Sequence, residues 1–528
     1  MLVQRYIYIS RPIFGSKPKV QNRGGELLQR NFKHDADCTP GRKKAGRLII
    51  VILFPILIVN ADCQERQPPA KKIVALMGGT LIDVSDFGNS TKDIEHSVII
   101  LNGGTITAIG TQDSLSPPAG SQILDIRGKY VIPGLIDGFG SMRTAAFGKA
   151  YLYEGVTSVY VQQAPLGEDG EQKLTIGFPT PHVLFGAMIG GYSAEGVQSK
   201  DHPWTAHRLK DRRLSQQEIV ARIDEIERTG NRGILASYDV WPDQLDIIVR
   251  EAHARSLVVL GEHAFTSYPY SVRADIDALP HNDRYQTAIA LAQSELSYSD
   301  DPEGLSGAPA YRDVCASNVA SPSVTAYGKQ LAAAHAALMP ILSIEATADD
   351  VDIPNPWSLP TAVFVHPEDL DDPVDPATGD RPYLKSHSPD RIAALKACAI
   401  HRQALDRRFH ELGARFLAAS GSPSYGIMPG SGLHVELALL NRIGLSPREA
   451  LAAATGNFAN VFGWQDVGLI ERGRRADIVV LDSDPREDIK ALDHIEIVIE
   501  GGTIIDRDKL LPHSSTGERD AGSGAPKL

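Results

Sequence analysis

Residues 131–142 read Val-Ile-Pro-Gly-Leu-Ile-Asp-Gly-Phe-Gly-Ser-Met, and this stretch decides how the rest of the chain is interpreted. It is apolar up to Asp137 and then continues into small residues that flank Phe139. The stretch also marks a change of pattern. Short strand-like runs lie before it, and alternating strand-like and helix-like segments follow it.

Residues 73–132 contain short apolar runs that end in glycine-rich turns. Residues 73–77 end at Gly78-Gly79, and residues 97–101 end at Asn102-Gly103-Gly104, which is a hairpin signal. The pattern predicts a small β-sheet unit.

Between Pro133 and Phe462, strand-like and helix-like segments alternate. Residues 215–228 have helical spacing behind Ser215, a good N-cap residue, and residues 233–238 are β-like. Alternation over such a length is typical of a (β/α)8 barrel. We therefore predict an α/β fold of this class for residues 133–462.

The C-terminal part begins with a strong helix signal at residues 446–455. Ser446 and Glu449 can cap each other's backbone, and Pro447 suits the first helical turn. Strand-like runs return after residue 475. Residues 513–528 are polar and glycine-rich, which predicts a disordered tail.

Charge is distributed unevenly along the 528 residues, whose formal net charge is −12. Residues 1–61 contain 11 Lys and Arg against 3 Asp and Glu, so the remainder carries a net charge of −20. An acidic body argues against a nucleic-acid partner, because phosphate binding needs a basic surface.

The N-terminal segment predicts export. Arg42-Lys43-Lys44 precedes the apolar residues 48–59, an order that resembles a secretory signal peptide, with a buried core strand as the alternative. We expect residues 1–61 to be a leader and the protein to be periplasmic or secreted. An oxidising compartment permits Cys315 and Cys398 to bond, and their spacing leaves this open.

Several stretches resemble the amidohydrolase superfamily, and within it the branch of imidazolonepropionase and Xaa-Pro dipeptidase. The stretches are Gly-Gly-Thr-Leu-Ile-Asp at 78–83, Gly-Lys-Tyr-Val-Ile-Pro-Gly at 128–134, Ala-Leu-Ala-Ala-Ala-Thr at 450–455 and Gly-Leu-Ile-Glu-Arg-Gly-Arg-Arg-Ala-Asp-Ile-Val-Val-Leu at 468–481. The resemblance covers residues 73–510. It implies a (β/α)8 barrel at residues 133–462 beside a composite β-sandwich built from residues 73–132 and 463–510.

The resemblance also implies a metal-dependent hydrolase whose ligands lie at the C-terminal ends of the barrel strands. Phe139 and Ser141 stand at the histidine positions of strand 1, and Ala236 stands at the lysine or glutamate position of strand 4. Pro423 stands at the position of the strand 8 aspartate, which handles the proton. The catalytic residues are therefore unknown.

Two family positions keep a histidine. His263 matches strand 5 and His281 matches strand 6, with a purely structural role as an equal alternative for each. Two imidazoles bind zinc weakly, because a stable site uses three or four ligands. We expect one weakly bound divalent ion, such as zinc, or none. Glu262 or Asp283 could complete a rebuilt site.

Two further residues are candidates for contact with a small-molecule substrate. His434 follows strand 8, and Tyr270 lies in a loop expected at the barrel mouth. The alternative for His434 is an ordinary histidine at a helix N-terminus, and the alternative for Tyr270 is ordinary loop packing.

Two functions remain open. The resemblance implies a hydrolase that acts on a C–N bond of an amide, a cyclic amide or a dipeptide-like small molecule. The residues at the site favour a catalytically inactive homologue, which would serve as a binding or regulatory subunit. Such a subunit would form a homo-oligomer, or a hetero-oligomer with an active relative.

Overall fold

The computed structural model describes residues 73–162, 179–190, 213–237, 240–263, 265–290, 313–351, 353–385 and 387–512. The predicted leader and the predicted C-terminal tail lie outside these residues. Among the described residues, no helix is both long and apolar enough to cross a membrane.

The eight barrel strands follow one another in chain order within one sheet, and each neighbouring pair is parallel. The sheet closes where the chain after the last strand returns to the first. The N–H of Gly138 donates to the carbonyl of Ala418 at 3.1 Å, and the N–H of Gly421 donates to the carbonyl of Phe139 at 2.9 Å. The predicted (β/α)8 barrel is confirmed. Its strands are β7 (Leu135–Asp137), β8 (Val156–Val161), β9 (His182–Ile189), β10 (Gly233–Ala236), β11 (Val258–Gly261), β12 (Ala278–Pro280), β13 (Ala337–Met339) and β14 (Arg415–Phe416).

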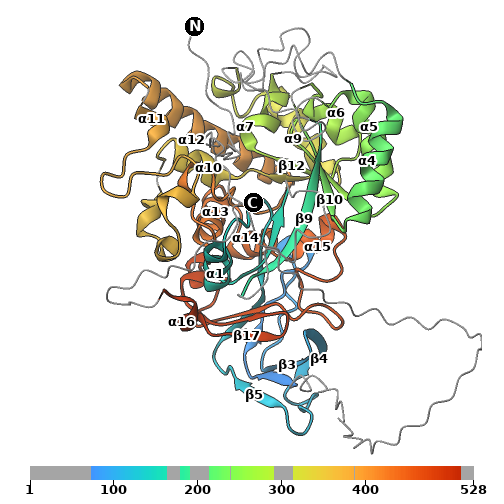
Figure 1. Ribbon diagram of the computed structural model, residues 1–528, viewed down its shortest axis with the longest axis vertical. Helices are drawn as coiled ribbons and strands as arrows, with labels where there is room; N and C mark the ends of the chain where they lie inside the picture. Colours follow the sequence, from blue (N-terminus) through green and yellow to red (C-terminus); the bar gives the residue numbers. More distant parts are fainter. Residues whose placement is uncertain are drawn as a thin grey trace, which may run out of the picture. The chain divides into compact units, whose positions relative to one another are not determined.

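Helices alternate with these strands, and Figure 1 shows α4 and α5 side by side beside β9 and β10. The helix α4 begins as the sequence predicts, because the N–H of Ser215 donates to the Glu218 carboxylate at 2.8 Å and the Ser215 hydroxyl caps in return. The helices are α1 (Ala145–Tyr153), α4 (Gln216–Arg228), α5 (Pro242–His253), α6 (Tyr268–Arg273), α7 (Asn282–Tyr285), α9 (Pro322–Ala333), α10 (Leu342–Ala348), α11 (Pro382–Lys385), α12 (Pro389–Glu411), α13 (Ser431–Arg442), α14 (Pro447–Ala453), α15 (Gly456–Phe462) and α16 (Arg507–Leu510).

Side chains along the barrel strands alternate between the interior and the surrounding helix layer, and this alternation decides which residues can reach the mouth. The interior cluster includes Tyr160, Leu184, Leu235, Leu260 and Met339. The outer cluster includes Ile234, Val259, Leu279, Leu338 and Phe416.

Two further sheets make up the composite β-sandwich. The first has the order β4–β3–β1–β5, and the second has the order β17–β16–β15–β6–β2. In the second sheet β6 pairs antiparallel with β15, which places Val131 opposite Val480. The composite sandwich predicted from the two ends of the chain is therefore present. Its strands are β1 (Val74–Met77), β2 (Thr80–Leu81), β3 (Ser97–Asn102), β4 (Thr105–Thr111), β5 (Gln122–Asp125), β6 (Tyr130–Pro133), β15 (Ile478–Leu481), β16 (Ile495–Glu500) and β17 (Thr503–Ile505).

One buried cluster packs the two sandwich sheets together. It contains Leu76 and Ile99 from the first sheet and Val131, Ile478 and Ile499 from the second. The N-terminal and C-terminal segments therefore share one apolar core, and each covers the other's apolar face.

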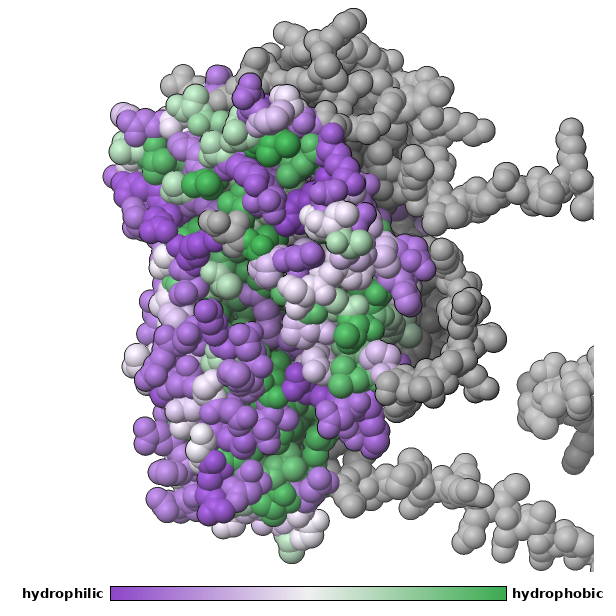
Figure 2. Space-filling model, turned by 90° about the vertical axis from the view of Figure 1, so that its left-hand side faces the viewer, coloured by the Kyte–Doolittle hydropathy of each residue, from purple (hydrophilic) through white to green (hydrophobic). Residues whose placement is uncertain are grey.

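The face drawn in Figure 2 is predominantly hydrophilic, with smaller apolar groups between the polar ones. Among the described residues, three large apolar side chains are exposed. They are Ile123 in β5, Val363 in the short 3₁₀ helix Pro360–Val363, and Ile400 in α12. They lie in separate elements, as scattered surface hydrophobic residues ordinarily do.

Candidate functional site

The alternation along β11 places Glu262 in the barrel mouth and turns His263 away from it. Leu260 belongs to the interior cluster and Val259 to the outer one, so the two-residue period carries Glu262 inward. The ring of His263 lies over the outer side of Gly261, where an added Cβ would be 2.4 Å from its Nε2 atom. From this alternation we infer that Glu262, rather than His263, takes the inward position at the end of strand 5. The role of His263 as a metal ligand stays a prediction.

Glu262 lies between two side chains from the segment that follows β12. Its Oε1 atom is 3.1 Å from Nε of Arg284 and 3.7 Å from Nε2 of His281. Glu262 and His281 are 3% and 5% exposed, so water screens these interactions weakly. Burial lowers the pKa of His281, and the carboxylate of Glu262 opposes that shift. The mouth therefore holds a buried carboxylate and a buried imidazole beside a partly exposed guanidinium.

Phe139 packs against His281. The two rings meet edge to face, with centroids 5.3 Å apart and planes at 71°. Phe139 is buried and belongs to the interior cluster, whereas Ser141 contacts the Tyr151 hydroxyl through its backbone. A phenyl ring has no lone pair for a metal, and here its body takes up volume beside the histidine that faces inward.

At strand 4 too, the residue that faces the barrel interior is one position away from the residue predicted from the sequence. Ala236 belongs to the outer cluster together with Ile234, whereas Leu235 faces the interior. The next inward residue is Ser237, whose hydroxyl oxygen is buried. We therefore infer that Ser237, which offers a neutral hydroxyl, reaches the interior where Ala236 does not. The assignment of the family's ligand position to Ala236 stays a prediction.

Pro423 lies in the buried loop that follows β14, close in sequence to a polar pair that joins β14 to β7. The hydroxyl of Ser420 donates to Oδ2 of Asp137 at 2.5 Å, and the N–H of Ser420 donates to Oδ1 at 2.9 Å. Burial raises the pKa of Asp137, and these hydrogen bonds oppose that shift. Asp137 is fully buried, so we interpret its role as structural: its hydrogen bonds with Ser420 connect the ends of the two strands.

The two residues predicted to contact substrate take part in contacts between helices. Nε2 of His434 donates to the carbonyl of Glu154 at 2.9 Å, and Glu154 follows α1 directly. The hydroxyl of Tyr270 in α6 donates to the carboxylate of Asp246 in α5 at 2.8 Å. A role in substrate binding stays a prediction for both residues.

The side chains at the strand ends do not fit the two-metal centre that the resemblance implies. In the described ranges, no three His, Cys, Asp or Glu side chains gather closely enough to hold a metal ion. His281 and Glu262 converge, whereas His263 faces the other side of its strand. Two donors are fewer than the three or four of an ordinary zinc site.

Helix α12 supports the segment that carries the mouth residues, a feature that the sequence analysis missed. Its Asp406 accepts hydrogen bonds from Nδ2 of Asn282 at 2.9 Å, the hydroxyl of Tyr285 at 2.7 Å and Nε2 of Gln286 at 2.9 Å. These residues come directly after His281. Burial raises the pKa of Asp406 to about 6. A lone aspartate in a long helix gives no sequence signal of burial, because most such residues face solvent.

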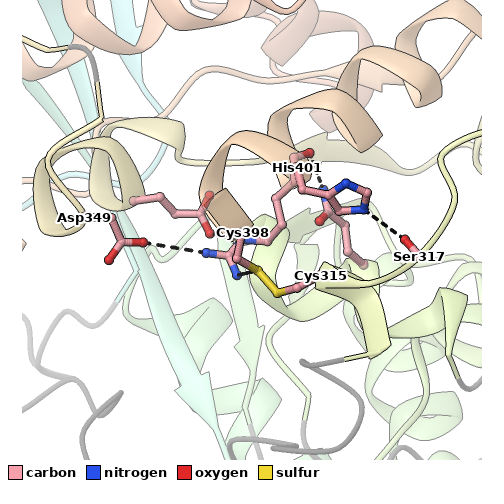
Figure 3. Close-up of a disulfide and its surroundings, with 8 residues drawn as sticks. Cys315, Ser317, Asp349, Cys398 and His401 are labelled. Atoms are coloured by element: carbon pink, nitrogen blue, oxygen red, sulfur yellow. Dashed lines mark hydrogen bonds and ion pairs between the residues drawn. A yellow bond between two sulfur atoms is a disulfide. The ribbon is translucent and has the colours of Figure 1, made fainter. Parts of the chain in front are cut away.

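A second buried group lies one turn earlier on α12. Arg402 is 1% exposed and forms an ion pair with Glu345 of α10. Its Nη1 atom donates to Sγ of Cys398 at 3.3 Å, and Cys398 forms a disulfide with Cys315 (Figure 3). Burial raises the pKa of Glu345, and the adjacent Arg402 guanidinium opposes that shift. The pairing that the sequence left open is present in the structure.

Comparison with known sequences supports the resemblance over the C-terminal part of the chain. Residues 344–505 match the model of the amidohydrolase family. Adenine deaminase 2 of Agrobacterium fabrum is 35% identical over 102 residues, which are 19% of this chain and 16% of that protein. Imidazolonepropionase of Rubrobacter xylanophilus is 36% identical over 119 residues, which are 21% of this chain and 28% of that protein. The matched stretches thus span less than a third of these curated relatives.

Comparison with solved structures covers most of the chain. A Xaa-Pro dipeptidase with bound methionine is similar with a TM-score of 0.53 and 16% identity, over 82% of this chain and 100% of that one. Bottromycin amidohydrolase is similar with a TM-score of 0.60 and 18% identity, over 84% and 88%. At these identities the likeness establishes the fold.

Proposed function

Because this chain resembles the amidohydrolase superfamily in fold and, over residues 344–505, in sequence, we propose that it is a ligand-binding homologue that does not perform the family's two-metal hydrolysis. The observation that carries the proposal is the packing of Phe139 against His281. A catalytic zinc needs three protein ligands and an open position for water. Here a phenyl ring is packed beside the histidine that faces inward.

The proposed ligand is a small amide or dipeptide-like molecule. Glu262 and Arg284 present opposite charges in a largely buried setting, 3.1 Å apart. A guanidinium binds carboxylates with good geometry, and a buried carboxylate favours an ammonium group or an amide N–H. A ligand with both kinds of group would match this pair. Any metal would be one weakly held divalent ion bound through His281 and Glu262.

Catalysis and binding are tested on one panel of N-acyl amino acids, Xaa-Pro dipeptides and cyclic amides, with zinc or manganese added. The proposal expects saturable binding of at least one class by calorimetry. It expects turnover well below the usual enzyme range of about 1–10³ s⁻¹. Turnover within that range, abolished by His281→Ala and retained in His366→Asn at an exposed position, would overturn it.

A second candidate is a hydrolase that uses the Glu262–His281 pair for proton transfer. The observation in its favour is the 3.7 Å separation of Oε1 of Glu262 from Nε2 of His281 in a buried mouth. Such a pair can move a proton to or from a bound water, a contribution of about 10²–10⁴-fold. In that case Glu262→Gln would reduce kcat by a factor in this range, and binding of the same substrate would persist.

Export and association with an active relative are proposed on sequence grounds. Residues 48–59 behind Arg42-Lys43-Lys44 support a cleaved leader. Phe139, Ser141 and Pro423 at the family's ligand and acid positions support a regulatory subunit. N-terminal sequencing of protein recovered from the periplasm should begin near Asp62. Light scattering of the purified chain, alone and mixed with an active homologue, tests the association. A cytosolic product that keeps residues 48–59 would contradict the proposal on export. A mixture that stays strictly monomeric would contradict the proposal on association.

A further inference from the structure

The Cys315–Cys398 disulfide lies at one end of a continuous set of contacts that leads to the barrel mouth. We propose that it is a redox-controlled latch: reduction by a dithiol loosens the segment after His281 and thereby changes the ligand-binding mouth. The inference concerns the position of that segment, so its test does not require the proposed ligand or activity.

The first step joins residues 313–317 to α12. Cys315 is bonded to Cys398, 83 residues away in sequence, and Nε2 of His401 lies 3.1 Å from the hydroxyl of Ser317. Figure 3 shows both contacts on the same side of the helix. Residues three and four apart share a helix face, so Cys398, His401 and Arg402 form one contact surface.

The second step runs along this face of α12. Arg402 contacts Sγ of Cys398, pairs with Glu345 and accepts a hydrogen bond at its carbonyl from Nε2 of Gln286 at 3.0 Å. One turn further, Asp406 also holds Gln286, through Oδ1 at 2.9 Å. The disulfide and the segment after His281 are therefore anchored to neighbouring turns of one helix.

The arrangement also favours one direction of attack by a reductant. Cys315 is partly exposed, whereas Cys398 is 5% exposed. A thiolate of an external dithiol would attack the sulfur of Cys315, the S–S bond would break and Cys398 would leave as a thiolate beside the Arg402 guanidinium. A nearby cation stabilises a thiolate and makes it a better leaving group.

The reaction is completed by the reductant. Its second thiol attacks the mixed disulfide and releases Cys315, so the dithiol is oxidised to a disulfide and the two cysteines gain two electrons and, on protonation, two protons. The new negative charge at Cys398 competes with Glu345 for Arg402. Residues 313–317 then keep the contact of Ser317 with His401 and the packing of Val314, which is 2% exposed, in the outer cluster.

Hydrogen–deuterium exchange of the whole protein tests the latch, with dithiothreitol as the dithiol. We expect amide exchange at residues 282–289 to accelerate about tenfold or more on reduction, with β16 unchanged. The variant Cys315→Ser with Cys398→Ser should show the fast exchange without the reagent and should not respond to it. Ser317→Ala, which removes only the His401 contact, is the matched control and should keep the slow exchange until it is reduced.

Two results would overturn the proposal. In one, faster exchange stays within residues 313–333 and α12, and residues 282–289 change by less than twofold. In the other, reduction accelerates amide exchange in β16 and in every other element alike, which would make the disulfide a general stabiliser of the fold.

Discussion

The ring of Phe139 meets the ring of His281 edge to face, with centroids 5.3 Å apart. One of these residues stands where the amidohydrolase resemblance expects a metal ligand, and the other is a histidine that faces the mouth. Their contact gives the aromatic ring a packing role in the barrel. The remaining polar groups of the mouth, Glu262 and Arg284, are paired with each other.

Phe139→Ala should destabilise the protein by about 3–5 kcal/mol, because the substitution leaves a cavity in the barrel interior. Ser141→Ala, at the second family ligand position, is the matched control and should change stability by less than about 0.5 kcal/mol. Urea denaturation measures both. Equal, small effects would show that the mouth tolerates an empty space beside His281.

The buried ring of His263 should make stability depend on acid. Burial lowers its pKa from 6.5 to about 3. The unfolded state therefore takes up the proton first, so stability is complete above about pH 6.5 and falls below it by up to about 1.4 kcal/mol per pH unit. His263→Asn should flatten the unfolding free energy between pH 6.5 and 4. His366→Asn, at an exposed position, should leave the wild-type slope.

Glu436 should make stability depend on pH in the opposite direction, so that its contribution is lost as pH rises. Its carboxyl is fully buried and accepts from the N–H of Ser343 at 2.8 Å, and burial raises its pKa from 4.5 to about 8. The native state keeps a proton that the unfolded state loses, so this contribution is complete below about pH 4.5 and is lost as pH rises towards 8. Glu436→Gln should become progressively more stable than the wild type over that range. Glu368→Gln, at an exposed position, should keep the wild-type dependence of stability on pH. If the two variants showed parallel pH profiles, the raised pKa would not belong to Glu436.

The sandwich should depend on its C-terminal strands. Ile478 is fully buried in β15, between β6 and β16. Ile478→Ala should cost about 2–5 kcal/mol. Ile123→Ala, on a side chain that is 49% exposed, should cost less than about 0.5 kcal/mol. Thermal unfolding compares them, and a neutral Ile478→Ala would mean that the two chain ends do not stabilise each other.

The fold could be predicted because its signals are local and repeated. The capping pairs Ser215–Glu218 and Ser446–Glu449 begin helices where the sequence predicted them. The apolar runs on both sides of the barrel became the strands of one sandwich, since neither set can bury its apolar face alone.

The site was harder to predict because it depends on the direction of single side chains. Side chains along β11 alternate between the interior and the outer layer, so a shift of one residue exchanges Glu262 for His263 at the mouth. Matching the sequence to a family pattern did not take this alternation into account. Asp406 and Arg402 were missed for another reason. Their partners Asn282 and Glu345 are far away in sequence, so only the folded chain shows that these charges are buried.

Metal content tests the central claim most directly. Protein purified without chelators is equilibrated with excess zinc, passed through a desalting column and measured by elemental analysis. Phe139 packs against His281, and the described residues place no third donor beside His281 and Glu262. We therefore predict at most one weakly held ion per chain, and less after desalting. Two ions retained per chain, and lost in His281→Ala, would contradict it.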